Sequence, residues 1–366
     1  MEPVVKAGIV GFGMSAQVFH APFLSTLPGY ELAAFVERRQ AASRQRYPHT
    51  KLYRSLEELL ADSDIDLVVI TTPNDTHFTY AMQALEAGKH VVLEKPFANS
   101  SAEAMALVQA AQQSKGVLSV YHNRRYVSDF LTIEQIVAQH LLGQVHEYEC
   151  HFDRYRPEAK PQAWREEPLP GSGILYDLGS HLIDQALYLF GLPKSVTADI
   201  RMQRPHARID DCFDLRLDFG FTKAILCSSM LVREMGPRYM IHGTLGSYIK
   251  SGDDPQEALL KEGMLPNGPD WGLEPAGIEG MLHTEIEGSQ VRKPLASLPG
   301  NFGYYYANLY QTLINGQPLR EHPAHGYNTI KIIELALQSH AEQRTIACQE
   351  LLEQPYPRNP LTPLAL

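Results

Sequence analysis

Five short runs of apolar residues follow one another through the first 121 positions of the chain, at residues 4–10, 31–36, 66–72, 90–93 and 117–121. Within these runs the Val, Ile and Leu residues are largely continuous rather than alternating with polar residues. Continuous apolar strands are typical of a parallel sheet that is covered on both faces. The runs therefore predict a buried parallel sheet in the N-terminal third of the chain.

Helix signals occupy the stretches between these runs. Ser55 is a candidate N-cap for a helix over 56–61, and Gly88 is a candidate C-terminal glycine for a helix over 75–87. A third helix is predicted over 102–113, between a pair of serines and a glycine. Strands and helices repeated in this way predict a doubly wound α/β domain.

The turn after the first run carries the pattern Gly11-x-Gly13-x-x-Ala16. The first glycine permits a tight turn, the second lets a pyrophosphate approach the backbone, and the alanine keeps the following helix close to the strand. Free N–H groups at a helix start also favour phosphate. We therefore predict dinucleotide binding, with an unliganded glycine turn as the alternative. The predicted cofactor-binding residues here are Gly11, Phe12, Gly13, Met14, Ser15 and Ala16.

Glu37 ends the second run, about 20 residues after Ala16, where a carboxylate that binds the ribose 2′-hydroxyl is expected. Arg38 and Arg39 follow it directly, and an arginine favours the 2′-phosphate of NADP instead. The three residues are predicted to bind the cofactor, but they give a mixed signal. We favour NAD because Glu37 occupies the strand end itself. A Glu37 side chain that turns away would favour NADP.

Two further motifs follow strands of the predicted sheet, at the edge where open α/β sheets bind ligands. Glu94-Lys95-Pro96 follows the fourth run, and Lys95 there can reach a substrate hydroxyl; the alternative is a surface lysine. A turn after the third run can close over the cofactor, and His77 is either part of it or only a histidine at a helix start. The cofactor-binding candidates in these motifs are Thr72, Pro73, Asn74, His77, Glu94 and Lys95.

After residue 123 the pattern changes to short runs that alternate roughly between apolar and polar residues, at 145–155, 196–202, 212–219, 223–232, 238–242 and 247–250. This alternation predicts a mostly antiparallel sheet with one open face. We therefore divide the chain into domains at 1–123 and 124–366. Residues 255–280 are rich in Gly and Pro and predict a long loop, while 328–343 predict an amphipathic helix that packs back on the first domain.

The segment 174–190 predicts a helix with two different faces. At 100° per residue, its leucines fall mainly on one arc, whereas Asp177, His181 and Asp184 fall on the opposite side within about 40° of each other. A solvated polar face is the alternative. A solvated face usually carries Lys, Glu or Gln, however, and this one carries short groups that can be positioned around a ligand.

Composition narrows the possible partners and compartment. The chain has 32 Lys and Arg against 42 Asp and Glu, a formal net charge of −10, whereas nucleic acids and anionic membranes reward a basic surface. We therefore expect neither as a partner. No apolar stretch reaches ~18 residues, and no signal peptide, HExxH motif or CxxC pair is present. These features predict a cytoplasmic protein with reduced cysteines and no metal centre.

Four motifs follow one another along the chain: the glycine-rich turn, the turn with His77, Glu94-Lys95-Pro96, and the series of Asp177, His181 and Asp184. Together, and in this order, they resemble the glucose–fructose oxidoreductase and inositol dehydrogenase (Gfo/Idh/MocA) family. Longer segments at 19–22, 119–125, 153–158, 164–165 and 176–181 resemble its scyllo-inositol 2-dehydrogenase branch. The resemblance implies a Rossmann domain followed by an α+β domain with a large, open-faced, mostly antiparallel sheet. It also implies NAD(P)-dependent oxidation of a sugar or cyclitol hydroxyl, by a homodimer or homotetramer that assembles through that sheet.

The resemblance also assigns roles to residues. Lys95, Asp177 and His181 are implied to be catalytic, and Asn123 is implied to lie at the cofactor. An imidazole titrates nearest neutral pH, so His181 is the best general base, while Lys95 would stabilise the developing alkoxide. The residues implied to bind substrate are Arg125, Tyr155, Trp164 and Asp184. Simple packing or surface charge is the alternative for Asn123, Arg125, Tyr155 and Trp164.

Two other functions remain open from the sequence. One is a reductase of another carbonyl or planar substrate on the same architecture. The other is a dinucleotide sensor without catalysis, although such a protein would be expected to lose the lysine or the Asp/His series. The sequence leaves open which polyol is the substrate, its stereochemistry and the direction of the reaction.

Overall fold

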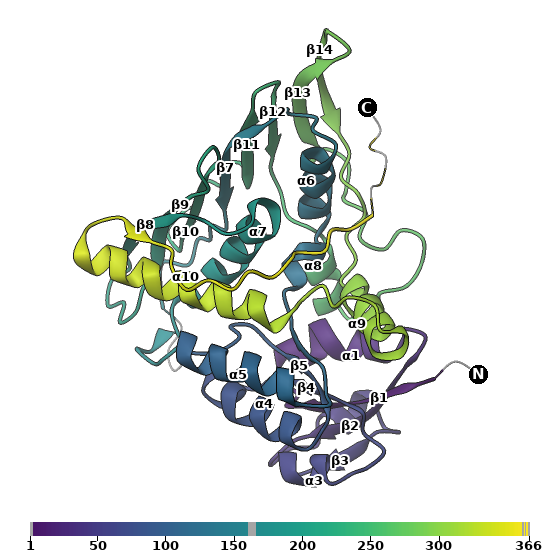
Figure 1. Ribbon diagram of the computed structural model, residues 1–366. Coiled ribbons are helices and arrows are strands. Elements are labelled where there is room, and N and C mark those ends of the chain that lie inside the picture. Colours follow the sequence, from purple (N-terminus) through teal and green to yellow (C-terminus); the bar gives the residue numbers. More distant parts are fainter. Residues whose placement is uncertain (1–2, 160–165, 361, 363, 365–366) are drawn as a thin grey trace. The chain divides into compact units, whose positions relative to one another are not determined.

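The computed structural model describes residues 3–159, 166–360, 362 and 364. The chain forms two compact units, and it passes between them several times (Figure 1). The first unit consists of Met1–Tyr126, Pro255–Trp271 and Asn301–Tyr327. The second consists of Val127–Asp254, Gly272–Gly300 and Asn328–Leu366. The predicted boundary at 123 lies close to the point where the chain first leaves the first unit.

The first unit is built on a six-stranded parallel sheet with the strand order β3-β2-β1-β4-β5-β6. This order is that of a doubly wound dinucleotide-binding fold. The strands are β1 Val5–Val10, β2 Tyr30–Val36, β3 Lys51–Tyr53, β4 Leu67–Ile70, β5 His90–Leu93 and β6 Leu118–Val120. The five predicted strands are therefore confirmed. The short strand β3 was not predicted, since three residues carry no clear apolar run.

The three predicted helices of this unit are confirmed as α3 Leu56–Leu60, α4 His77–Glu86 and α5 Ser101–Gln113. The Ser55 side chain accepts a hydrogen bond from the Glu58 N–H, as a helix N-cap does. The backbone of Gly88 has a φ of 73°, as expected of a glycine after a helix. The remaining helical segments are η1 Ala16–His20, α1 Ala21–Leu24, α2 Ser43–Arg46, η2 Asn74–Thr76, η3 Asn123–Tyr126, α8 Gln256–Lys261 and α9 Gly303–Asn315.

Helix α9 completes the core of the first unit, although it lies far along the chain from the sheet. Tyr305 and Tyr306 of this helix are fully buried, and the Tyr305 ring packs edge-on against Tyr121, with ring centroids 4.7 Å apart. Helix α8 lies within residues 255–280, which we predicted to be a loop. That prediction is wrong for Gln256–Lys261, where a short helical turn is surrounded by Gly and Pro.

The second unit is built on a nine-stranded sheet with the order β14-β13-β12-β11-β7-β10-β9-β8-β15. All neighbouring strands are antiparallel except β7 and β10. The strands are β7 Val145–His151, β8 Ser195–Arg201, β9 Cys212–Asp218, β10 Lys223–Ser229, β11 Tyr239–Gly243, β12 Ser247–Lys250, β13 Gly280–Ile286, β14 Ser289–Leu295 and β15 Ile346–Ala347. The six predicted runs are confirmed, and β13, β14 and β15 were not predicted.

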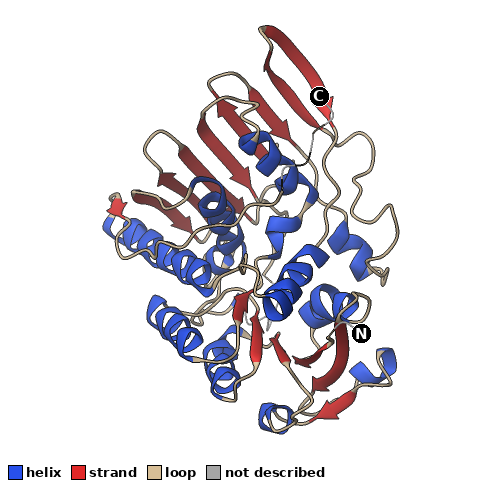
Figure 2. Cartoon of the chain, turned by 45° about the vertical axis from the view of Figure 1, so that its right-hand side comes forward, coloured by secondary structure: helices blue, strands red, loops and turns tan. Residues whose placement is uncertain are grey.

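Helices cover one face of this sheet. They include α6 Ser128–Ala138 and α7 Ser180–Phe190, which is preceded by the π-helical turn η5 Leu175–Gly179 (Figures 1 and 2). In strand β9, Phe213, Leu215 and Leu217 are buried, whereas the residues between them are not. The alternation confirms the predicted one-sided sheet. The predicted C-terminal helix forms most of α10 Pro323–Glu342.

Over the residues that the structure describes, no helix combines the length and apolarity needed to cross a lipid bilayer. The four cysteines, Cys150, Cys212, Cys227 and Cys348, are all free thiols.

Candidate active site

The glycine-rich turn after β1 has the geometry that a phosphate-binding turn requires. Gly11 has a φ of 97°, and its N–H donates to the Val36 carbonyl oxygen at 3.0 Å, which fixes the turn against β2. A Cβ added at Gly13 would meet no atom within 4 Å, so this stretch of backbone borders open space. Ala16 is fully buried. The residues present therefore fit a pyrophosphate at this turn.

Glu94 of the Glu-Lys-Pro motif lies at the centre of a buried hydrogen-bond network. Its carboxylate accepts a hydrogen bond from the Ser15 hydroxyl. It also accepts one from the backbone N–H of Lys95, the next residue, at 3.0 Å. His20 Nε2 lies 3.0 Å from the same carboxylate, and His20 Nδ1 lies 2.6 Å from the Tyr306 hydroxyl. A proton on His20 Nε2 lets the ring donate to the Glu94 carboxylate.

Burial of Glu94 alone would raise the pKa of its carboxyl group. The hydrogen bonds from His20 and Ser15, together with nearby positive charge, outweigh that effect and lower the pKa to about 2. Glu94 is therefore a carboxylate at neutral pH. It connects the helical turn after the glycine-rich loop to the strand end that carries Lys95, so we interpret it as a positioning residue. Sequence analysis missed His20 and Tyr306, because only folding brings them together.

His77 joins the loops after β4 and β5. Its Nδ1 lies 2.9 Å from the Pro96 carbonyl oxygen, and its Nε2 lies 3.0 Å from the Thr72 carbonyl oxygen. Burial lowers the pKa of the ring, which favours a neutral imidazole that donates to one of these oxygens. Both ring nitrogens of His77 thus face the protein backbone. The geometry favours a role for His77 in holding together the loop of Thr72, Pro73 and Asn74 and the loop of Pro96, over direct contact with the cofactor.

Glu37 is held by the backbone of the turn that follows it. It is only 8% exposed, and its two carboxylate oxygens accept hydrogen bonds from the backbone N–H groups of Ala42, at 3.0 Å, and Ser43, at 2.9 Å. The side chain therefore points back into the turn that leads to helix α2. Each carboxylate oxygen keeps a second lone pair, so a role in binding the ribose is compatible with this geometry.

In the second unit, the segment Leu175–Phe190 carries the predicted polar series. Its first turn, η5, is π-helical, and this turn includes Asp177. π-helical turns are rare and are frequent at functional sites. His181 and Asp184 lie on α7 and are 6% and 2% exposed. His181 and Asp184 are therefore enclosed by the protein rather than on a solvated face, whereas Asp177 is half-buried.

Asp210 holds the beginning of this helical segment. Its Oδ2 accepts a hydrogen bond from the Leu175 N–H at 2.8 Å, and its carbonyl oxygen accepts one from the Ile174 N–H at 3.2 Å. Burial raises the pKa of Asp210 to about 6, although the backbone N–H groups oppose the effect. Gly173 precedes the helix with a φ of 86° and lies against the Asp210 carboxylate. Sequence analysis missed Asp210.

The remaining predicted site residues differ in their surroundings. Asn123 is 4% exposed at the start of η3. Arg125 is 1% exposed, and its guanidinium donates to the Arg320 carbonyl oxygen at 3.0 Å, so packing explains it better than substrate binding. Tyr155 is 38% exposed and lies under the guanidinium of Arg233. Trp164 lies outside the described residues.

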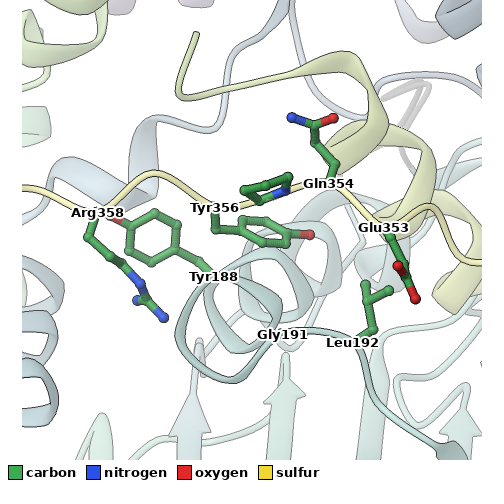
Figure 3. Close-up of a pocket in the computed structure, with 8 residues that line it drawn as sticks. Tyr188, Gly191, Leu192, Glu353, Gln354, Tyr356 and Arg358 are labelled. Atoms are coloured by element: carbon green, nitrogen blue, oxygen red, sulfur yellow. The ribbon is translucent and has the colours of Figure 1, made fainter. Parts of the chain in front are cut away.

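A separate pocket of about 480 Å³ lies in the second unit, where the C-terminal segment passes the end of α7 (Figure 3). Its lining residues are Tyr188, Gly191, Leu192, Glu353, Gln354, Pro355, Tyr356 and Arg358. None of the predicted site residues is among them. Within the described part of the chain, no group of three His, Cys, Asp or Glu side chains is placed to hold a metal ion.

Comparison with known proteins covers almost the whole chain. Profiles of the Gfo/Idh/MocA group match in two parts, "Oxidoreductase family, NAD-binding Rossmann fold" over residues 5–122 and "Oxidoreductase family, C-terminal alpha/beta domain" over residues 134–348. The chain is 40% identical over 343 residues to a Bacillus subtilis protein named scyllo-inositol 2-dehydrogenase (NADP(+)) IolW, an alignment that spans 93% of this chain and 95% of that protein.

Two other relatives agree with these matches. The uncharacterized oxidoreductase YdgJ of Escherichia coli is 42% identical over 350 residues, which is 95% of this chain and 99% of YdgJ. The solved structure of yvaA from Bacillus subtilis has a TM-score of 0.92 and 39% identity, covering 95% of this chain and 99% of that one. With both halves matched by family profiles, the chain belongs to the Gfo/Idh/MocA family of NAD(P)-binding oxidoreductases.

Proposed function

We propose that this protein oxidises a secondary hydroxyl group of a cyclitol or sugar, and reduces the corresponding ketone in the reverse direction. The observation that carries the proposal is the enclosure of His181 and Asp184 on α7, directly after the π-helical turn that contains Asp177. Imidazole and carboxylate groups are natural hydrogen-bond partners of hydroxyls. The name of the Bacillus subtilis relative, a scyllo-inositol dehydrogenase, supports a cyclitol as the substrate.

Each residue has a distinct part in the proposed reaction. When bound at the glycine-rich turn, NAD or NADP supplies the hydride acceptor. His181 takes the hydroxyl proton during oxidation and returns it during reduction. The Lys95 ammonium donates a hydrogen bond to the reacting oxygen and stabilises its developing negative charge. Asp177 orients His181 or binds a neighbouring hydroxyl, and Asp184 binds substrate hydroxyls.

The residues around Lys95 support this role. Glu94 accepts a hydrogen bond from the Lys95 backbone N–H, so the network of Ser15, His20 and Tyr306 reaches the backbone that carries the lysine. A positioned ammonium stabilises charge without reorganisation during the reaction. We further propose, from the family resemblance, that the protein assembles as a dimer or tetramer through the open face of its nine-stranded sheet.

The test is a substrate panel of inositols and sugars, assayed in both directions by the absorbance of the reduced nicotinamide. We expect His181→Ala and Lys95→Met to lower kcat by about 10²-fold or more while cofactor binding stays intact. Lys115→Met, the same substitution as at Lys95 but at an exposed position after α5, is the control and should have no effect. Near wild-type turnover in both site variants would refute the assigned roles. Turnover only of planar carbonyl compounds, or cofactor binding without turnover, would favour the alternative functions.

A further inference from the structure

The chain approaches its C-terminus as an extended segment that crosses the second unit. We call residues 352–360, which form neither helix nor strand, the C-terminal strap. Its beginning is held by α10, because the Leu352 N–H donates a hydrogen bond to Asn328 Oδ1 at 2.8 Å. Its end is held by α6, because Gln135 Nε2 donates one to the Pro360 carbonyl oxygen at 3.3 Å. Between these two points the strap passes the end of α7, and its Arg358 lies beside Tyr188 (Figure 3).

Arg358 of the strap closes the C-terminal end of α7. Its Nη2 donates a hydrogen bond to the Leu189 carbonyl oxygen at 2.8 Å, and its guanidinium lies 4.5 Å from the centre of the Tyr188 ring. The last four carbonyl oxygens of an α-helix have no partner within the helix, and the helix dipole favours a positive charge beside them. Arg358 supplies both the donor and the charge. The strap therefore caps α7.

Glu134 of α6 joins the strap to the same helix from inside the protein. It is 1% exposed, and its Oε1 accepts hydrogen bonds from the Tyr188 hydroxyl at 2.6 Å and from the Asn359 N–H at 2.9 Å. Its Oε2 accepts a further hydrogen bond from Asn359 Nδ2 at 2.6 Å. Helix α6, helix α7 and the strap thus meet at one buried carboxylate.

Tyr188 lies on the same face of α7 as two residues of the proposed active site. At 100° per residue, His181, Asp184 and Tyr188 fall within about 60° of one another. Because the helix is stiff, a rotation about its axis that moved Tyr188 would also move His181 and Asp184. Catalytic groups must be held within about 0.5 Å, and a displacement of about 1 Å can cost ~10²-fold in rate.

We infer that the C-terminal strap fixes the rotation of α7, and that Arg358 and Glu134 are positioning residues for His181 and Asp184. The chemical roles of His181 and Asp184 rest on the proposed function, whereas the contact between the strap and α7 does not. The pocket of about 480 Å³ is lined both by the strap and by the residues that end α7. The strap therefore holds the helix through a few side chains rather than through continuous packing.

The test removes the cap and observes α7 directly. Arg358 is exposed, so the full-length Arg358→Ala protein should fold. In hydrogen–deuterium exchange without substrate, the amides near the C-terminal end of α7 should exchange at least about 5-fold faster, because the last turn opens more often without its cap. Arg292→Ala, an exposed arginine on β14, is the matched control and should leave this exchange unchanged. Arg358→Lys keeps a charged donor and should restore part of the protection.

The ring of His181 shows whether the loosened helix changes the active site. NMR of protein with isotope-labelled histidine identifies the His181 signal by its absence from His181→Ala. We expect Arg358→Ala to shift this signal, whereas Arg292→Ala should not. In the polyol assay, Arg358→Ala should lower kcat/KM by about 10-fold, because His181 and Asp184 are displaced, while cofactor affinity stays within about 2-fold.

The possible outcomes separate the inference from the proposed function. Unchanged exchange in Arg358→Ala would overturn the hold of the strap on α7. Faster exchange with an unchanged His181 signal, or with unchanged kcat/KM on a polyol that the wild type oxidises, would overturn the positioning role. A wild-type protein that turns over no polyol would count against the proposed function, and the exchange and the His181 signal would still decide the inference.

Discussion

At the residue scale, Glu94 shows how one buried carboxylate can serve several chain segments at once. Its partners Ser15 and His20 come from the turn after the glycine-rich loop, and Tyr306, which contacts His20, comes from residues almost 300 positions later. A carboxylate can only accept hydrogen bonds. Ser15 and His20 contact it directly, and Tyr306 is linked to it through His20. The network therefore depends on a negatively charged group at position 94.

Replacing Glu94 by Gln should disrupt this network although the two side chains have almost the same shape. The amide keeps one acceptor oxygen, but its NH₂ group then faces a donor. We expect a loss of about 1–3 kcal/mol in the free energy of unfolding, because at least one buried donor is left without an acceptor. We also expect kcat/KM to fall by about 10-fold, because the backbone of Lys95 is no longer held.

Urea denaturation and steady-state kinetics measure the two effects. Glu86→Gln is the control, since Glu86 is an exposed residue at the end of α4, and it should change neither quantity. A Glu94→Gln protein with wild-type stability and turnover would show that the carboxylate is not needed to position Lys95.

At the element scale, the entry to the helix with Asp177 and His181 depends on a close contact. Gly173 adopts a φ of 86°, and a Cβ on it would lie 2.0 Å from Asp210 Oδ1. Gly173→Ala should therefore be destabilising for two reasons, a strained backbone and the displacement of the carboxylate that caps Leu175. We expect a loss of about 1–3 kcal/mol in unfolding free energy and a lower kcat.

Gly236→Ala is the matched control in the same unit. Gly236 has no atom within 4 Å of the added Cβ and no left-handed φ, so its substitution should leave stability and turnover unchanged. Thermal denaturation of both variants at one pH makes the comparison. Equal melting temperatures for the two variants would contradict the proposed role of the contact between Gly173 and Asp210.

Elements with local signals could be predicted from the sequence. The apolar runs of the first sheet, Ser55 as an N-cap and Gly88 after a helix all depend on neighbouring residues. Elements defined by distant partners could not. Helix α8 has Gly and Pro on both sides, and β13 and β14 pair with each other at the end of a sheet. The site has the same limit. The Glu37 carboxylate accepts hydrogen bonds from the backbone of Ala42 and Ser43, and the sequence pattern does not identify these partners.

At the scale of the whole molecule, the first unit is not continuous in sequence. Its sheet comes from residues before Tyr126, but its core is completed by Pro255–Trp271 and Asn301–Tyr327. Side chains from the later segments are buried in this core and form hydrogen bonds with the earlier one. Tyr126 donates a hydrogen bond to Glu321 at 2.5 Å, and Tyr305 donates one to Ser119 at 2.7 Å. A dinucleotide-binding domain cut from the chain after Tyr126 would lack Glu321 and Tyr305.

We therefore expect a fragment of residues 1–126 to be collapsed without being uniquely packed. It keeps the parallel sheet, but it exposes Tyr121 and Tyr126 and leaves Arg125 without the Arg320 carbonyl oxygen and Glu321. Buried groups that lose their partners cost about 1–3 kcal/mol each, which is large compared with the ~5–15 kcal/mol that stabilises a typical protein. The expected signs are far-UV circular dichroism without a near-UV signal, and binding of a hydrophobic dye. The full-length chain is the reference. A fragment with a sharp urea transition and full near-UV signal would show that residues 255–271 and 301–327 contribute little to this core.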